Sequence, residues 1–128
     1  MARLFNVEVF NQVIGGGSPA PVYYSGPQFN ALLGSADELT IQYIVDATGG
    51  SLPAVVTFEP QCNNTEEEAL WEATASTKTV TITAQSDLPG STIDRYSLSS
   101  AFAAYGRFKV TADKHSVSAR IIVCGWGR

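Results

Sequence analysis

The fold class is decided by the stretch Lys78-Thr79-Val80-Thr81-Ile82-Thr83-Ala84-Gln85. Its apolar residues Val80, Ile82 and Ala84 alternate with threonines. Successive side chains point to opposite faces of a strand, so an alternation with a period of two indicates a strand with one buried face. Valine, isoleucine and threonine also favour the extended backbone. We therefore expect a β-strand over residues 78–85.

The same period recurs on both sides of this stretch, and it predicts five more strands: residues 4–13, 39–46, 54–59, 107–111 and 117–126. Segments rich in glycine, proline and serine separate them, and such segments mark turns. We expect Pro60 to end the strand over 54–59, because proline lacks the N–H that a sheet ladder needs. We also expect a long turn over 86–92 and a hairpin connection over 112–116. Residues 97–105 are weakly patterned.

These elements, with a short extended stretch over residues 22–24, amount to about eight short strands joined by short connections. Short connections favour antiparallel pairing, and no alternating helical pattern accompanies the strands. The sequence therefore predicts an all-β protein, an antiparallel β-sandwich or jelly roll. We expect one domain overall, with a strand and an uncharged extended arm in residues 1–37 and the sandwich in residues 38–128.

The arm is defined by its lack of charge, since residues 9–36 contain no charged side chain. Prolines at 19, 21 and 27 bracket residues 22–24, which are expected to form an extended arm or an edge strand. One interpretation is an apolar loop that covers the protein's own core. The other is an arm that docks on a neighbouring subunit, because interface cores are poor in charge and rich in aromatic residues. The candidate interface residues are Phe10, Val13, Ile14, Val22, Tyr23, Tyr24, Phe29, Leu32 and Leu33.

The composition disfavours nucleic acid and membrane surfaces as partners. Charged residues make up 16% of the 128 residues, and the formal net charge is −4. The eight basic residues are scattered and form no patch that could neutralise phosphates or anionic lipids. The N-terminus lacks the apolar core of a cleaved signal peptide, so we expect the protein to be made in a cytoplasm and not exported by such a signal.

No motif in the sequence predicts catalysis, a cofactor or a metal. His115 is the single histidine, and no G-x-S-x-G nucleophile motif occurs. The acidic run at 66–68 lacks the spacing of a calcium loop. Cys62 and Cys124 are too few for a zinc site, and their spacing leaves a disulfide open. We expect a protein that is not an enzyme; a small hydrolase that uses His115 or a carboxylate pair remains the competing hypothesis.

Several short motifs follow one another within residues 42–128 in an order that resembles known β-sandwich proteins. The resemblance lies in Glu59-Pro60-Gln61, a polar loop and Leu70-Trp71-Glu72, followed by residues 105–111 and 118–123. This arrangement is similar to small jelly-roll virion proteins of tailed bacteriophages, including capsid decoration or cement proteins. The resemblance implies a virion structural protein, a homo-oligomer that contacts the major capsid protein or other virion proteins.

The same layout also resembles galactose-binding-like carbohydrate modules, which gives an alternative function. A carbohydrate-binding or receptor-binding module would present exposed aromatic rings to sugars. The candidates for such rings are Trp71, Trp126, Tyr23 and Tyr24.

Overall fold

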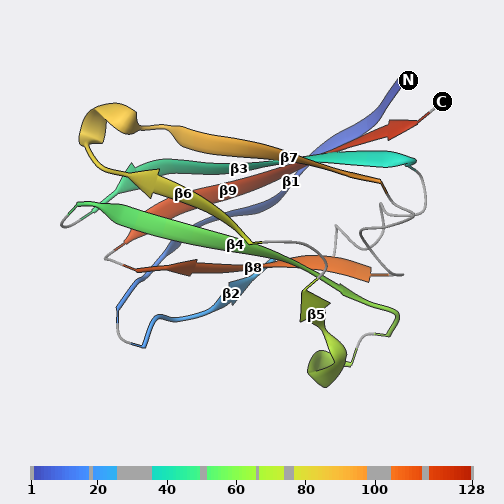
Figure 1. Cartoon of the computed structure of the whole chain (residues 1–128), viewed down its shortest axis with the longest axis horizontal. Coiled ribbons are helices and arrows are strands. Elements are labelled where there is room, and N and C mark those ends of the chain that lie inside the picture. The colour runs from blue at the N-terminus through green and yellow to red at the C-terminus, as the bar shows by residue number, and fades with distance from the viewer. Residues whose placement is uncertain are drawn as a thin grey trace.

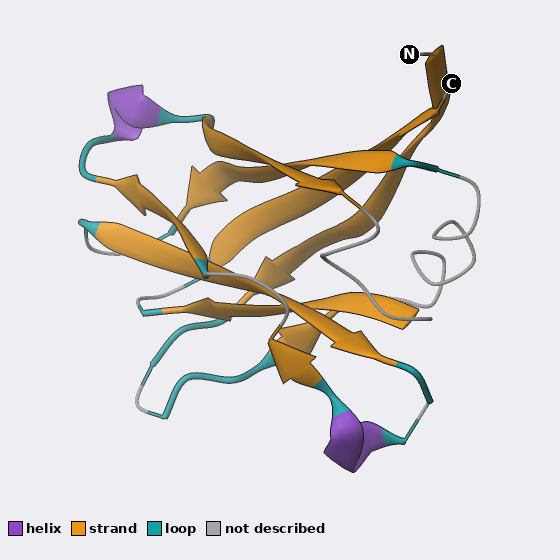
Figure 2. Ribbon diagram, turned by 45° about the vertical axis from the view of Figure 1, so that its right-hand side comes forward, coloured by secondary structure: helices purple, strands orange, loops and turns teal. Residues whose placement is uncertain are grey.

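The computed structural model of the chain describes residues 2–17, 19–25, 36–49, 52–65, 67–73, 77–97, 105–113 and 116–127. Within these ranges the chain forms two antiparallel β-sheets that lie one above the other (Figure 1). The expected all-β sandwich is therefore confirmed, with nine strands where about eight were expected. Figure 2 shows the two layers with short helical turns at their margins.

Sheet 1 contains four strands in the order β1, β9, β3, β7. Their bounds are Ala2–Ile14, Val117–Gly127, Glu38–Thr48 and Gly90–Ser97. Sheet 2 has the order β2, β8, β4, β5, and β6 also pairs with β4. Their bounds are Tyr23–Tyr24, Tyr105–Ala112, Ala54–Asn63, Glu72–Ala73 and Lys78–Ile82. Two short 3-10 turns, η2 (Glu68–Leu70) and η3 (Gln85–Asp87), precede β5 and β7. No helix in the described residues is long and apolar enough to cross a membrane.

The strand pairs are nested, which is the order of a jelly roll. β4 pairs with β6, β3 with β7, β2 with β8 and β1 with β9. Successive pairs alternate between the two sheets. The chain is thus arranged as one long folded ribbon wound around a common core.

This order corrects the expected hairpin over residues 112–116. β8 lies in sheet 2 and β9 in sheet 1, so the connection crosses the sandwich and joins no paired strands. Its described ends are tied to other elements. Asp113 exchanges hydrogen bonds with the backbone of Val55, and the carbonyl of Ser116 accepts one from Gly49. The short connection led us to predict that β8 and β9 pair as a hairpin. That pairing is wrong, because the connection leads from one sheet to the other.

The core fills the space between the sheets. The apolar residues that alternate along β3 and β9 are all buried: Leu39, Ile41, Tyr43, Val45, Val117, Ala119, Ile121 and Val123. The Tyr43 ring lies between sheets, 4.9 Å from the centroid of Phe58 and 5.7 Å from that of Phe108. Each such large side chain contributes about 1.5–3 kcal/mol through burial. Alternation along these strands thus predicted the core residues correctly.

Two strands end elsewhere than expected. β4 continues through Pro60, which lies opposite Phe108 of β8. On its other side, β4 pairs with β6 up to Phe58 and with β5 from Gln61. In the described part of the chain, Pro60 therefore lies between these two pairings, and neither of them needs an N–H from it. β6 stops at Ile82 because the Asp87 carboxylate accepts hydrogen bonds from Thr83 and Ala84 and turns the chain into η3.

β7 was missed from sequence, since residues 86–92 were expected to form a turn. Its residues are mostly polar, and among those described Tyr96 is the only one that is buried. Ile93 faces outward and is exposed. β7 is an edge strand with little apolar signal, and its pairing with β3 defines it.

β1 is a strand of sheet 1. It comes from residues 1–37, which we expected to lie outside the sandwich of residues 38–128. It pairs with β9 from Ala2 to Ile14. A register shift between Glu8 and Phe10 turns both Val9 and Phe10 toward the core. Near its start the Phe5 ring covers Gly125 so closely that a Cβ there would overlap it. Residues 9–14 of the expected arm thus belong to β1, and residues 23–24 form the edge strand β2.

Candidate functional site

The surface along β1, β2 and the segment between them carries several exposed large apolar side chains, and β1 and β2 are edge strands of the two sheets. Residues 15–22 link these strands directly, and the Tyr23 hydroxyl accepts a hydrogen bond from the Gly15 backbone. We name this surface the β1–β2 flank. Its exposed apolar residues are Leu4, Val13, Val22 and Tyr24. The other exposed large apolar residues described are Leu70 and Ile93.

The flank contains some of the candidate interface residues and excludes others. Val13, Val22 and Tyr24 are exposed, and Tyr23 is half-buried. Phe10 and Ile14 are buried in the protein's own core, because the register shift in β1 turns their side chains inward. These two residues therefore stabilise the fold and are not part of the exposed flank. Phe29, Leu32 and Leu33 lie outside the described residues.

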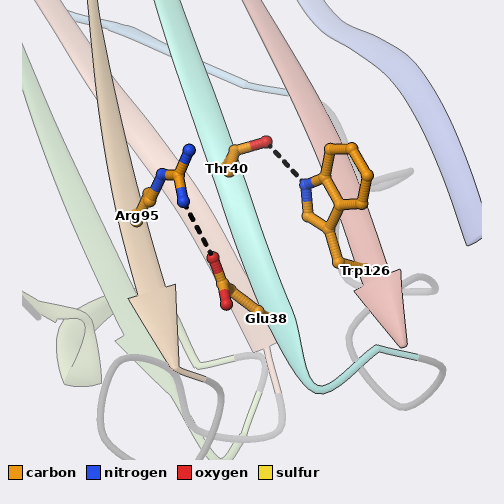
Figure 3. Close-up of a pocket in the computed structure, with 4 residues that line it drawn as sticks. All are labelled: Glu38, Thr40, Arg95 and Trp126. Carbon is orange, nitrogen blue, oxygen red and sulfur yellow. Dashed lines mark hydrogen bonds and ion pairs between the residues drawn. The ribbon is translucent and has the colours of Figure 1, made fainter. Parts of the chain in front are cut away.

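A hollow of about 290 Å³ lies on the outer face of sheet 1, and its described lining is Glu38, Thr40, Arg95 and Trp126 (Figure 3). The register of three neighbouring strands brings these side chains together. Arg95 of β7 is opposite Thr40 of β3, and Trp126 of β9 is opposite Glu38. Glu38 and Thr40 are two residues apart and so project from the same face of β3.

The contacts inside the hollow fix the indole but leave the two charges weakly paired. Trp126 Nε1 donates a hydrogen bond of 3.0 Å to Thr40 Oγ1. Arg95 Nη1 lies 4.0 Å from Glu38 Oε1, which is too long for a direct hydrogen bond. The Arg95 side chain is 77% exposed and that of Glu38 30%. Among the described residues, both charged groups therefore keep most of their hydrogen-bonding capacity.

A second arginine cluster lies on the outer face of sheet 2 and has the opposite character. The Arg107 guanidinium lies 4.0 Å from the ring centroid of Tyr24 and 4.4 Å from that of Trp71. Its Nε donates to Gln61 Oε1 at 2.7 Å, and its Nη1 donates to Glu68 Oε2 at 2.9 Å. The hydrogen bond from Arg107 lowers the pKa of the Glu68 carboxyl. Two aromatic rings and two hydrogen bonds hold the Arg107 guanidinium, so we assign this cluster a structural role.

A smaller hollow of about 140 Å³ lies on the same outer face of sheet 2. Glu59 of β4 and Lys109 of β8 are directly opposite in the sheet and both line it. The other lining residues are Val22, Thr57, Thr77 and Thr111. None of its described lining residues has an aromatic ring.

The remaining residues considered for chemistry are not brought together in the part of the chain that the structure describes. His115 and Glu66 lie outside that part. Within it, no group of three or more histidine, cysteine or acidic residues is placed to hold a metal ion. Cys62 on β4 and Cys124 on β9 belong to different sheets, and both are free thiols.

Comparison of the chain with protein-family models, curated proteins and solved structures gave no match.

Sequence reasoning identified Trp126 as a ring that could contact sugars, but it missed Glu38, Thr40 and Arg95 as its neighbours. Trp126 lies 31 positions after Arg95 and 86 after Thr40, and these side chains meet only through the register of β7, β3 and β9. The alternation along β3 could have indicated that Glu38 and Thr40 face outward, because they flank the buried Leu39. Nothing in the sequence indicated Arg95, because β7 itself was not predicted.

Proposed function

We propose that this protein is a virion structural protein that stabilises a bacteriophage capsid through its β1–β2 flank. The partners are the major capsid protein and further copies of the same chain. The observation that carries the proposal is the combination of Leu4, Val13, Val22 and Tyr24 on one flank with a stretch of 28 residues, 9–36, that has no charge.

The chemistry of this flank suits a protein partner. Interface cores are depleted of charge and enriched in aromatic residues, and contact with a partner would remove these exposed apolar side chains from water. Both strands are also sheet edges among the described strands, and backbone groups on such an edge can pair with another chain. On a symmetric shell many weak copies of this contact would act together, so no single tight site is needed.

The jelly-roll order is compatible with the proposal, since capsid domains of many viruses use it. The same fold also serves lectins and other proteins, so the fold alone does not select a function. The apolar flank is the feature that favours assembly.

Sedimentation with particles tests the proposal. Val13→Asp and Val22→Asp place a charge on the flank at exposed positions, where the fold should tolerate it. We expect each variant to bind particles assembled from the major capsid protein of the same virus at least about tenfold more weakly than the wild type. Ile93→Asp is the matched control, because Ile93 is 58% exposed and lies on β7 at the other edge of sheet 1.

Circular dichroism should show that all three variants stay folded. Wild-type binding by both flank variants, or an equal loss with Ile93→Asp, would contradict the proposed surface. Analytical ultracentrifugation of the free chain measures self-association, which the same two flank variants should weaken.

A further inference from the structure

The hollow on sheet 1 differs from the flank because it combines a flat apolar ring with two charges of opposite sign. The hydrogen bond to Thr40 occupies the indole N–H of Trp126 and fixes the plane of the ring. The carbon face of an indole packs well against the C–H groups of a ring-shaped ligand. Figure 3 shows Trp126 on one side of β3 and Arg95 on the other, with Thr40 and Glu38 on β3 between them.

The separation of Arg95 from Glu38 decides what kind of polar group fits between them. A guanidinium only donates hydrogen bonds and a carboxylate only accepts them. A hydroxyl group does both, so one hydroxyl can accept from Arg95 and donate to Glu38 at the same time. An ammonium group cannot accept from Arg95, and a carboxylate cannot donate to Glu38. The 4.0 Å gap between the two side chains is thus better suited to a hydroxyl than to either ion.

Arg120, on the same outer face of sheet 1, is held differently from Arg95. On sheet 1, Arg120 Nε lies 2.6 Å from Asp46 Oδ2, and its Nη1 lies 3.2 Å from Glu8 Oε2. These short contacts leave Arg120 committed to the fold, whereas Arg95 has only the long contact with Glu38 among the described side chains.

We propose that the hollow lined by Glu38, Thr40, Arg95 and Trp126 binds a neutral saccharide. The sugar ring would pack on the Trp126 indole while its hydroxyls bridge Arg95 and Glu38. The volume of about 290 Å³ is close to the lower end of the ~300–1,000 Å³ typical of small-ligand sites. The opposed charges of Arg95 and Glu38 disfavour both strongly anionic and strongly cationic ligands. This site shares no lining residue with the β1–β2 flank, and it adds a glycan-binding activity to the proposed structural role.

Tryptophan fluorescence can report on this site specifically, because Trp71 and Trp126 are the two tryptophans of the chain. A Trp71→Phe background leaves Trp126 as the single reporter. The labelled full chain is first applied to an array of neutral and sialylated glycans. Glucose, galactose, mannose, N-acetylglucosamine and the neutral array hits are then titrated while Trp126 emission is followed. We expect binding of at least one neutral glycan with a saturable change in emission.

Arg95→Ala and Glu38→Gln should each weaken that binding by about tenfold, the loss expected for a hydrogen bond to a charged group. The matched controls are Lys109→Ala and Glu59→Gln in the smaller hollow on sheet 2, and both should bind as the wild type does. Absence of any neutral hit, binding of sialylated glycans alone, or wild-type affinity in both Arg95→Ala and Glu38→Gln would overturn the proposal.

The two proposals fail independently. Arg95→Ala should still sediment with capsid particles, and Val13→Asp should still bind the neutral glycan. A variant of the flank that loses the glycan as well would contradict a separate site.

Discussion

Arg107 and Arg95 lie on the outer faces of opposite sheets and differ in how much of each side chain the fold uses. The Arg107 side chain is 12% exposed. It contacts the rings of Tyr24 and Trp71 and donates hydrogen bonds to Gln61 and Glu68. Arg95 is 77% exposed, and its side chain has one long contact with Glu38 among the described residues. The residue type is the same, so the difference must come from the position of each strand.

The topology explains the difference. β8 carries Arg107 and lies between β2 and β4, so Tyr24 and Gln61 flank it from both sides. The excursion between β4 and β6 then places Glu68 and Trp71 over it. β7 carries Arg95 at the edge of sheet 1 and has β3 alone as its partner. A central strand therefore commits an arginine to structure, whereas the edge strand leaves one available for a ligand.

The largest expected effect is the loss of stability in Arg107→Ala. The change removes two cation–π contacts and leaves the nearly buried Gln61 without its donor. We expect the free energy of unfolding to fall by about 2–4 kcal/mol. Urea denaturation followed by circular dichroism measures it.

Arg95→Ala is the control for this experiment, and its free energy of unfolding should stay within about 0.5 kcal/mol of the wild type. Equal losses in the two variants would show that Arg107 and Arg95 are used alike, contrary to the comparison.

Arg120→Ala should give a smaller loss than Arg107→Ala, because Arg120 is intermediate in exposure at 32%. The Asp46 and Glu8 carboxylates that pair with it are partly open to solvent, and salt screens such pairs. We therefore expect the difference from the wild type to shrink as sodium chloride rises from low to high concentration. Urea denaturation at several salt concentrations tests this. A loss that does not change with salt would indicate that packing of the Arg120 stem, and not charge, holds the contact.

The strands that carry these arginines were not equally predictable from sequence. β8 was expected because Phe108 and Val110 alternate with polar residues, and both are buried. β7 offered no such pattern, since Tyr96 is its one described buried residue and Ile93 faces solvent. Local alternation thus predicts strands that cover the core, but it does not predict a polar edge strand that is held by pairing.

The two candidate surfaces also differ in what the sequence could indicate. The uncharged stretch over residues 9–36 is contiguous, so its apolar character was visible, and Val13, Val22 and Tyr24 are indeed exposed. The inward turn of Phe10 was not visible, because it depends on a bulge in the pairing with β9. Predicting the hollow at Trp126 would have required the register of three strands. Alternation along a strand shows which face of the sheet a residue is on, but it does not show which residues of other strands lie beside it.

The smallest expected effect concerns Glu68, the exposed partner of Arg107. The hydrogen bond from Arg107 lowers the pKa of this carboxyl from its ordinary value of 4.5. A carboxyl with a lowered pKa in the folded state stabilises the fold above the pKa of the unfolded chain, and this contribution is lost as the pH falls through the folded pKa. Glu68→Gln should therefore be slightly less stable than the wild type near pH 7, and the two should converge as the pH falls well below 4.5. Urea denaturation across this pH range measures the difference, with Glu72→Gln on neighbouring β5 as the control. A difference that persists unchanged at low pH would mean that the Glu68 charge does not stabilise Arg107. Among the described residues, Tyr24, Trp71 and Gln61 would then be the ones that hold the Arg107 side chain in place.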